Sequence, residues 1–409
     1  MTLELIVGMA LSAALVAVIG ALTVSRERTR AGRRLLVAGL MLRVVGGLAY
    51  LALLQTVYGG GDYTRYMGEA TAVVESEQDS YRYDLTVTEL YDGRWWGTPS
   101  ISILTAQIMR VVGTGYITVF VVYGLISYLA ALCFVYAFRG AFPHIDSLVY
   151  TRWIMLWPSL WFWPSPVGKD GPVLLGLGLA FLGVVGIRGH RNYLLAALGT
   201  AITLAVRPQY AFVFAAALVA GVVLGRRTRG GGVAKALFVA AVLAGATYLV
   251  TVSSDFLGFS VTETEETSQW IDNRGTATAY GGSAFEAATD PFTGAFNVLF
   301  RPFLWEASGG FVLLSSLEVL ALWVLLIRRR RACAEFIRRY HRTEVFWISV
   351  LFTILLASAV GMAVGNFGTL VRQRIHLYPF LFILTSSLPY LHAKGMAVRR
   401  RVIQPSLAG

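Results

Sequence analysis

Long apolar segments alternate with short polar connections along almost the whole chain. Eleven such segments of about 14–24 residues lie at residues 3–24, 35–58, 115–138, 148–163, 172–187, 193–206, 209–225, 236–253, 308–327, 345–364 and 377–392. A helix of about 20 mainly apolar residues crosses a bilayer. The pattern therefore predicts an all-α protein, a polytopic transmembrane helix bundle with about 11 spans.

Two of these predicted spans are short for a bilayer. Residues 148–163 and 193–206 have lengths that also suit tilted or re-entrant segments. The segments 193–206 and 209–225 can, in addition, form a hairpin that does not cross the membrane. In that case the sidedness of every other span stays the same.

Two long polar segments interrupt the apolar pattern, at residues 59–114 and 254–307. Neither is long or regular enough to form an independent domain, so we expect one integral membrane domain over residues 1–409. Tryptophan side chains such as Trp95 and Trp305 are typical of the lipid headgroup zone. We therefore expect interfacial helices and loops that cap the membrane core on one side.

Composition and charge support this interpretation. A soluble domain carries about 25% charged residues, whereas this chain is 14% charged and 56% hydrophobic. If the N-terminus is outside, the predicted cytoplasmic connections hold 23 of the 35 Lys and Arg and 4 of the 23 Asp and Glu. Basic residues near span ends mark the cytoplasmic side. We therefore expect a plasma-membrane protein with its N-terminus outside and its C-terminus in the cytoplasm, in contact with membrane lipids and not with nucleic acid.

Other composition features exclude some kinds of site. Cys133 and Cys333 form no disulfide framework, and the five His are scattered. We expect no cofactor, although a divalent metal ion is not excluded. The first apolar segment begins with MTLEL, which has an acid and no base, so it is expected to be a span and not a cleaved signal peptide.

Charged side chains with neighbouring Gly, Pro or aromatic residues gather in five connections on the predicted outer side. They are GGGDYTRY with Asp62 and Arg65, VGKDG with Lys169 and Asp170, VRPQY with Arg207, FRPFLWE with Arg301 and Glu306, and GNFGTLVRQRIHLYP with Arg372, Arg374 and His376. Cations in a low-dielectric recess favour phosphate groups, and a carboxylate can take a proton from an attacking hydroxyl. The residues predict a site for a lipid-linked phosphate, with Asp62 as the base and Asp170 as the second functional carboxylate.

Each of these residues also has a simpler interpretation. Arg207 and Arg301 suit membrane anchors whose charged heads extend into water, and Asp62 suits a helix N-cap. Lys169 and Asp170 suit a turn that precedes a helix. Arg43, inside the second span, is expected to extend toward the cytoplasmic end and not to line a cavity. Convergence of the five connections on one cavity would favour a ligand site over separate anchors.

Arg372 and Arg374 are two residues apart, just before the last apolar segment. In an extended stretch such residues point the same way, whereas a helix separates them by about 200°. Gly365 and Gly368 favour the extended form. We therefore expect the two arginines to form a paired fork for phosphate oxygens.

The order GDYTRY, PSLWFWPSPVGKDG, RPQY, RPFLWE and NFGTLVRQRIHLYPFLFIL resembles a broad set of bacterial membrane proteins. This set belongs to exopolysaccharide and O-antigen gene clusters and includes repeat-unit polymerases and GT-C glycosyltransferases. The resemblance implies an outward-facing site that uses a polyprenyl-linked glycan donor, with a glycan or lipid as acceptor and no nucleotide sugar.

The resemblance also implies roles for some residues. In GT-C enzymes an acidic residue of the first long outer loop is the base, and Asp62 has the comparable place, although here the loop follows the second span. In repeat-unit polymerases outer-loop arginines bind the diphosphate leaving group. Residues of the matching type are Arg207, Arg301, Arg372 and Arg374.

The sequence thus predicts a membrane glycosyltransferase or polysaccharide repeat-unit polymerase. One alternative is a transporter or flippase for lipid-linked glycans, which should have charged or Gly/Pro-broken spans near the midplane and paired repeats. Another is an assembly protein without chemistry. The clustering of charge at the predicted outer side favours the enzyme.

Overall fold

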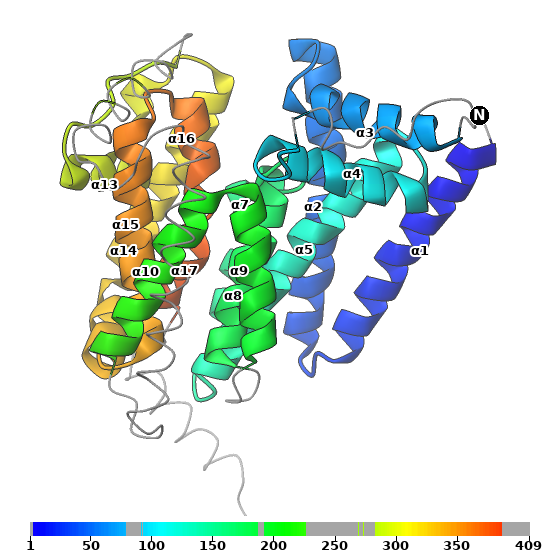
Figure 1. Cartoon of the computed structure of the whole chain (residues 1–409). Helices are drawn as coiled ribbons and strands as arrows, with labels where there is room; N and C mark the ends of the chain where they lie inside the picture. The colour runs from blue at the N-terminus through cyan, green and yellow to red at the C-terminus, as the bar shows by residue number, and fades with distance from the viewer. Residues whose placement is uncertain are drawn as a thin grey trace, which may run out of the picture.

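The computed structural model describes residues 3–78, 91, 93–186, 192–225, 269, 273 and 283–386. This part of the chain is helical, without strands, as Figure 1 shows. The helices are α1 (Leu3–Ser25), α2 (Arg30–Leu53), η1 (Leu54–Tyr58), α3 (Asp62–Gln78), α4 (Thr98–Val112), α5 (Tyr116–Ala141), α6 (Leu148–Leu156), α7 (Pro158–Phe162), α8 (Asp170–Val185), α9 (Tyr193–Val206), α10 (Pro208–Leu224), α13 (Pro291–Phe300), η3 (Leu304–Glu306), α14 (Gly310–Tyr340), α15 (Glu344–Ala363), α16 (Phe367–Arg374) and α17 (Tyr378–Thr385).

Five of the described helices are long and apolar enough to cross a membrane: α1, α2 with its continuation into η1, α5, α14 and α15. The apolar helices α8, α9, α10 and α13 are shorter, with 10–17 residues. The all-α class and the presence of candidate membrane spans are thus confirmed. The count of about 11 spans stays a prediction, since residues 236–253 and the end of 377–392 lie outside the described residues.

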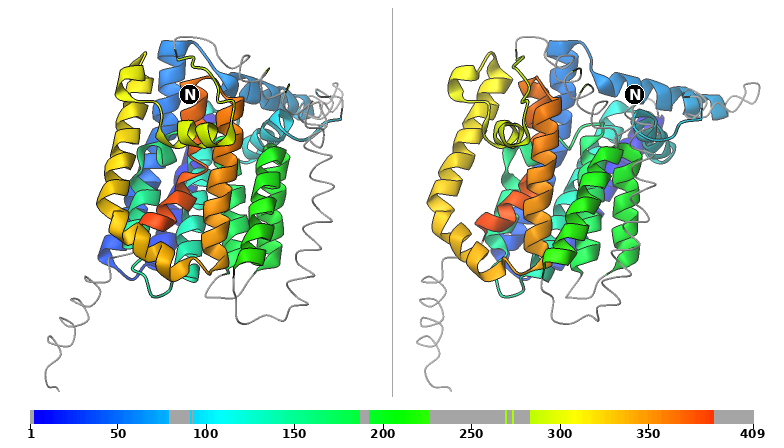
Figure 2. Two further views of the ribbon diagram at one scale, coloured as in Figure 1. Left: turned by 90° about the vertical axis from the view of Figure 1, so that its left-hand side faces the viewer. Right: turned by 60° about the vertical axis from the view of Figure 1, so that its left-hand side comes forward.

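The helices α3, α4, α13 and α16 lie at one end of the bundle, which we call the α3 end (Figure 1). The start of α1 lies at this end, and the connection between α1 and α2 lies at the other. The two further views in Figure 2 show α3 extending sideways across the top of the bundle. In the described part of residues 59–114, the expected capping helices are therefore present as α3 and α4.

The predicted span 148–163 is two short helices and not one. Trp157 has an extended backbone (φ −64°, ψ 126°) between α6 and α7, and Pro158 is the first residue of α7. Proline disfavours helical geometry in the residue before it and removes a backbone donor. The chain therefore bends here, before it reaches the turn with Lys169 and Asp170.

Arg43 stabilises this break. Its guanidinium donates to the carbonyl oxygens of Ile154 at 2.9 Å, Met155 at 3.3 Å and Leu160 at 3.2 Å, and its side chain is fully buried. The expectation that Arg43 extends toward the membrane surface is wrong. A helix end leaves carbonyl groups without partners, and in an apolar interior the nearest donor has to satisfy them.

The helices α8 and α9 pack against each other without intervening side chains. A Cβ on Gly199 would lie 2.2 Å from the backbone nitrogen of Ala180, so glycine is required for this close approach. The two helices run in opposite directions. The start of α8, at Asp170, therefore lies beside the end of α9, which is followed by Arg207.

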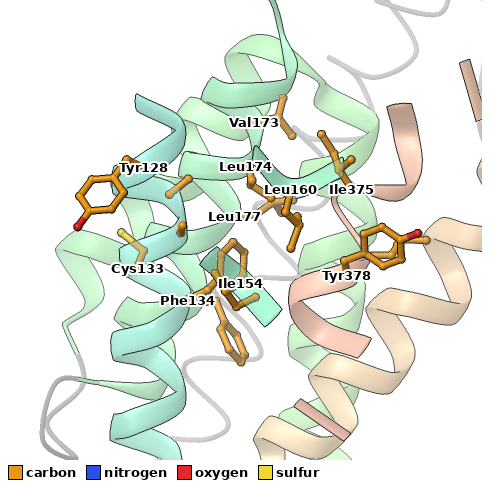
Figure 3. Packing of buried hydrophobic residues seen from close by; sticks show 14 of the residues in the cluster. Tyr128, Cys133, Phe134, Ile154, Leu160, Val173, Leu174, Leu177, Ile375 and Tyr378 are labelled. Carbon is orange, nitrogen blue, oxygen red and sulfur yellow. The ribbon is translucent and has the colours of Figure 1, made fainter. Parts of the chain in front are cut away.

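An aromatic core supports α17, the helix whose first two residues end the GNFGTLVRQRIHLYP segment. The ring of Phe380 lies 5.4 Å from that of Phe134 and 4.7 Å from that of Phe352. In Figure 3, Ile375 lies close to Leu160 and Leu174 from α7 and α8. This packing fixes α16 and α17 against the helix that begins with Asp170.

Candidate functional site

Asp170 is the centre of an ion-paired cluster at the α3 end. Its Oδ1 accepts from Arg207 Nη2 at 2.8 Å, and its Oδ2 accepts from Arg372 Nε. The Asp170 side chain is 2% exposed. Three of the five predicted connections, those with VGKDG, VRPQY and GNFGTLVRQRIHLYP, therefore meet at one carboxylate.

Arg372 extends this cluster to a fourth connection. Its Nη1 lies 3.7 Å from Asp62 Oδ2 at the start of α3, and the Asp62 side chain is 74% exposed. A Cβ on Gly168 would lie 3.4 Å from Arg372 Nη2, which places the VGKDG turn directly against the guanidinium. Arg372 thus lies between one buried and one accessible carboxylate.

Lys169 adds a further cation to this region. Its Nζ donates to Thr98 Oγ1 at 3.0 Å, and the side chain is half-buried. The Gly97 nitrogen donates to the carbonyl oxygen of Ala205 at 2.7 Å, which ties the start of α4 to the end of α9. Burial and the charge of Arg207 lower the pKa of the Lys169 ammonium to about 8. We call Asp62, Lys169, Asp170, Arg207 and Arg372 the Asp170 cluster.

Polar side chains that the sequence did not single out hold Arg207 in place. Its Nη1 donates to Tyr210 Oη at 3.1 Å and to Gln373 Oε1, and the Tyr210 hydroxyl also donates to Gln373 Oε1. Tyr210 is one helical turn from Arg207, and Gln373 follows Arg372 directly. Their closeness in sequence to Arg207 and Arg372 is the feature that could have identified Tyr210 and Gln373 as site residues.

His376 lies beneath the cluster and is fully buried. One ring nitrogen, Nδ1, lies 3.0 Å from the carbonyl oxygen of Gln373, and the other, Nε2, lies 4.0 Å from Asp170 Oδ1. Burial and the charge of Arg207 lower the pKa of His376 to about 4. The imidazole is therefore neutral near pH 7, and it adds no positive charge for a phosphate.

The predicted fork of Arg372 and Arg374 is wrong. The Asn366 side chain caps α16 by accepting from the Gly368 nitrogen at 2.9 Å, and both arginines belong to this helix. Arg374 turns away from Asp170 and donates to the carbonyl oxygens of Val298 and Arg301. It is 1% exposed, so it holds α13 in place and does not reach a ligand.

Arg301 and Glu306 form a second ion pair at the α3 end. Arg301 Nε donates to Glu306 Oε1 at 2.8 Å, and the guanidinium carbon lies 5.0 Å from the ring centre of Phe285 and 5.2 Å from that of Phe367. This pair contacts the α16 segment through Phe367. None of its described contacts joins the Asp170 cluster.

Arg65 also forms its described contacts elsewhere. Its Nε donates to Glu69 Oε1 at 2.9 Å within α3, and its Nη2 donates to the Tyr91 hydroxyl at 2.7 Å. Ser102 donates to Glu69 Oε2 at 2.6 Å and thereby links α3 to α4. The Arg65 side chain is 58% exposed. Its own described contacts therefore hold Glu69 and Tyr91, and it is Glu69 that links α3 to α4.

A pocket of about 660 Å³ lies against the Asp170 cluster. Arg372 lines it, as does Gly60, two residues before Asp62. Its other lining residues are the aromatic side chains Tyr50, Trp163 and Phe311, the polar side chains Ser283, Ser308, Asn366 and Thr369, and Leu53, Leu54, Gly309, Gly310, Val312 and Gly368. The pocket therefore has aromatic and polar walls and a guanidinium at one side.

The structure thus brings together five of the ten predicted site residues as the Asp170 cluster, with His376 beneath it. Arg65, Arg301, Glu306 and Arg374 have other partners, although Arg301 and Arg374 contact the segments around α16. Among the described residues no group of three or more His, Cys, Asp and Glu is arranged to hold a metal ion.

Comparisons with known proteins identify no relative of this chain. The chain matches no protein-family model, no curated protein and no solved structure. Its function therefore has to be inferred from the residues of the site.

Proposed function

We propose that this chain is a GT-C-like membrane glycosyltransferase or repeat-unit polymerase of cell-surface polysaccharide biosynthesis. Its donor is a sugar linked to a polyprenyl phosphate or diphosphate, and its site faces the outside of the plasma membrane. One observation carries the proposal. Arg372 connects a buried, fully paired carboxylate and an exposed carboxylate at the edge of a pocket with aromatic and polar walls.

The aromatic and polar walls suit a sugar. Tyr50, Trp163 and Phe311 line the pocket, and aromatic rings suit the apolar side of a pyranose, whereas the polar lining residues Asn366 and Thr369 suit its hydroxyl groups. A volume of about 660 Å³ is within the range of small-molecule sites. The phosphate of the donor would then lie toward Arg372.

The chemistry follows from the two carboxylates. The acceptor hydroxyl oxygen attacks the anomeric carbon, its proton passes to Asp62, and the bond from the anomeric carbon to the phosphate oxygen breaks with its electron pair on the phosphate. Arg372 stabilises the departing negative charge, and such interactions typically contribute a few kcal/mol. Lys169 attracts the phosphate equally in the bound donor and in the transition state, and so contributes mainly to binding. Asp62 is accessible for proton transfer, whereas Asp170 is buried and positions Arg207 and Arg372.

Cells that lack this chain should accumulate its donor. We expect a polyprenyl-linked sugar to build up in their lipid extract, and the wild-type gene to remove it. The Asp62→Asn gene should fail to remove it even though its protein reaches the membrane in normal amounts. Unchanged levels of all lipid-linked sugars in the deficient cells would contradict the proposal.

The orientation of the bundle can be tested by labelling. Because the basic connection between α1 and α2 lies opposite the α3 end, we place the α3 end outside. In a variant without Cys133 and Cys333, a membrane-impermeant maleimide should label Glu286→Cys in intact cells but not Ser25→Cys. The reverse labelling pattern would place the site in the cytoplasm and remove polyprenyl-linked sugars of the outer leaflet as its substrates.

Binding of the donor should weaken at high pH. The Lys169 ammonium, with a pKa of about 8, carries its charge below this pH and loses it above. We therefore expect kcat/KM for the donor to fall by about tenfold between pH 7 and pH 9 in wild-type protein. In Lys169→Arg, whose side chain stays charged, the fall should disappear. An equal fall in both proteins would show that another group titrates.

A transporter for lipid-linked glycans is the second candidate. It is favoured by the break between α6 and α7 and by two charged side chains near it: the buried Arg43, and the half-buried Glu318, which accepts from the Ser159 hydroxyl. Broken helices with buried charge are typical of transporter sites. However, Arg43 already donates to four carbonyl oxygens, which favours a structural role. Movement of a lipid-linked sugar across liposomes without its consumption would support the transporter.

A further inference from the structure

We propose that the donor carries its sugar on a single phosphate and not on a diphosphate. This inference rests on the proposed function and specifies the substrate of the same site. It is carried by the balance of charges in the Asp170 cluster. Once the ion pairs of this cluster are counted, one cation, Lys169, has no carboxylate partner among the residues that the structure describes.

Two of the three cations in the cluster are engaged by carboxylates. Arg207 and Arg372 both bond to Asp170, and Arg372 also lies 3.7 Å from Asp62. Two guanidinium groups are therefore matched by two carboxylates. Removing either arginine from Asp170 would leave one oxygen of a 2% exposed carboxylate without its guanidinium donor. These pairs are thus expected to persist when a ligand binds.

Lys169 is the remaining cation of the cluster. Its described partner is the neutral hydroxyl of Thr98, at 3.0 Å, and its side chain is half-buried. The Asp170 cluster therefore presents one surplus positive charge. A half-buried charge without a counter-ion is unfavourable, so the cluster favours a ligand that brings one negative charge.

The other arginines among the predicted site residues do not change this balance. Arg301 is paired with Glu306, and Arg65 is paired with Glu69. Arg374 is 1% exposed, and backbone carbonyl oxygens occupy its donors. Each of these side chains would have to leave its present partners before it could contact a phosphate.

The two classes of donor differ in charge. A sugar joined to a lipid through one phosphate is a phosphodiester with one negative charge at neutral pH, whereas the diphosphate form carries two. The singly charged donor neutralises the cluster. The doubly charged donor would leave a net negative charge at the Asp170 cluster unless it brought a further cation.

The test uses the lipids that accumulate in cells lacking the chain. These cells are grown with a radiolabelled sugar precursor, and their lipid extract is separated by anion-exchange chromatography into singly and doubly charged fractions. Each fraction is incubated with the water-soluble or lipid acceptor fraction of the same cells and with purified wild-type protein in liposomes, in the presence of Mg²⁺ so that the diphosphate has a counter-ion. We expect the protein to consume the singly charged lipid.

The outcomes separate the inference from the proposed function. Consumption of the doubly charged lipid, alone or equally well, would overturn the single-phosphate donor and leave a glycosyltransferase. Consumption of neither lipid would overturn both. Consumption of the singly charged lipid alone supports both.

Variants test whether Lys169 supplies the surplus charge. Lys169→Gln should raise KM for the singly charged donor by at least about tenfold, equivalent to about 1.4 kcal/mol, with a smaller change in kcat. Lys169→Arg should retain most of the affinity. The matched control is Arg94→Gln, an exposed cation of the segment that leads to Thr98, and its KM should not change. A wild-type KM in Lys169→Gln would overturn the charge assignment.

Discussion

Asp62→Asn is expected to lower the turnover number by about 10²–10⁴-fold, the usual contribution of a general base. Asparagine keeps the size of the side chain and most of its hydrogen bonding but cannot accept the proton of the acceptor hydroxyl. Because Asp62 is 74% exposed and its described ion-pair contact with Arg372 is long, at 3.7 Å, folding should be little affected. Turnover is measured with purified protein, the lipid that accumulates in deficient cells and the acceptor fraction of the same cells.

The control for this variant comes from the same helix. Glu75 is an exposed carboxylate of α3, and Glu75→Gln should retain wild-type turnover. If Asp62→Asn also turns over at the wild-type rate, Asp62 is not the base. A loss in both variants would point to α3 as a whole and not to the chemistry of Asp62.

Asp170→Asn should affect the folded state more than any exposed substitution. It leaves Arg207 and Arg372 without their buried carboxylate, and breaking a buried ion pair by removing one partner typically costs about 3–5 kcal/mol. We expect a clearly lower midpoint of thermal unfolding in detergent, together with loss of activity. Glu286→Gln, an exposed substitution at the same end, should leave the midpoint unchanged.

The opposite result would exchange the roles of the two carboxylates. If Asp170→Asn unfolds at the wild-type temperature but has no turnover, then Asp170 takes part in the reaction and does not merely position the arginines. The variant Asp170→Glu adds a second readout, because it keeps the charge while displacing it. It should recover part of the stability if ion pairing is what Asp170 provides.

Helices with a continuous apolar pattern could be predicted closely from the sequence. The predicted segment 193–206 agrees with α9 (Tyr193–Val206), and 209–225 lies within one residue of α10 (Pro208–Leu224). In both cases a Pro, a Gly or a polar residue marks the end of the run. The break between α6 and α7 was harder to predict, because Trp157 and Pro158 lie inside a segment that is apolar throughout.

Side-chain directions within the site could not be predicted in the same way. Asp170 meets Arg207 and Arg372 across 37 and 202 residues of sequence, and no local pattern encodes such contacts. The error on Arg372 and Arg374 has a local cause. Two glycines suggested an extended stretch, but the Asn366 cap and the packing of Phe367 and Leu370 favour a helix, which turns the two arginines apart.

Arg43 illustrates the same limit. From the sequence alone, a cation in an apolar span can extend to the membrane surface or remain in the protein interior. The choice depends on the carbonyl groups of Ile154, Met155 and Leu160, which the break in another helix leaves free. A prediction for Arg43 therefore required a prior prediction of that break.

The central claim, that the pocket beside the Asp170 cluster transfers a sugar from a lipid phosphate, is tested most directly by transfer in a purified system. Wild-type protein and Asp62→Asn are reconstituted in liposomes with the radiolabelled lipid from deficient cells and its water-soluble or lipid acceptor fraction. We expect the wild-type protein to move the label from the lipid phosphate to the acceptor, and Asp62→Asn to leave it on the lipid. Label that stays on the lipid phosphate with wild-type protein, or moves equally fast with Asp62→Asn, would contradict the claim.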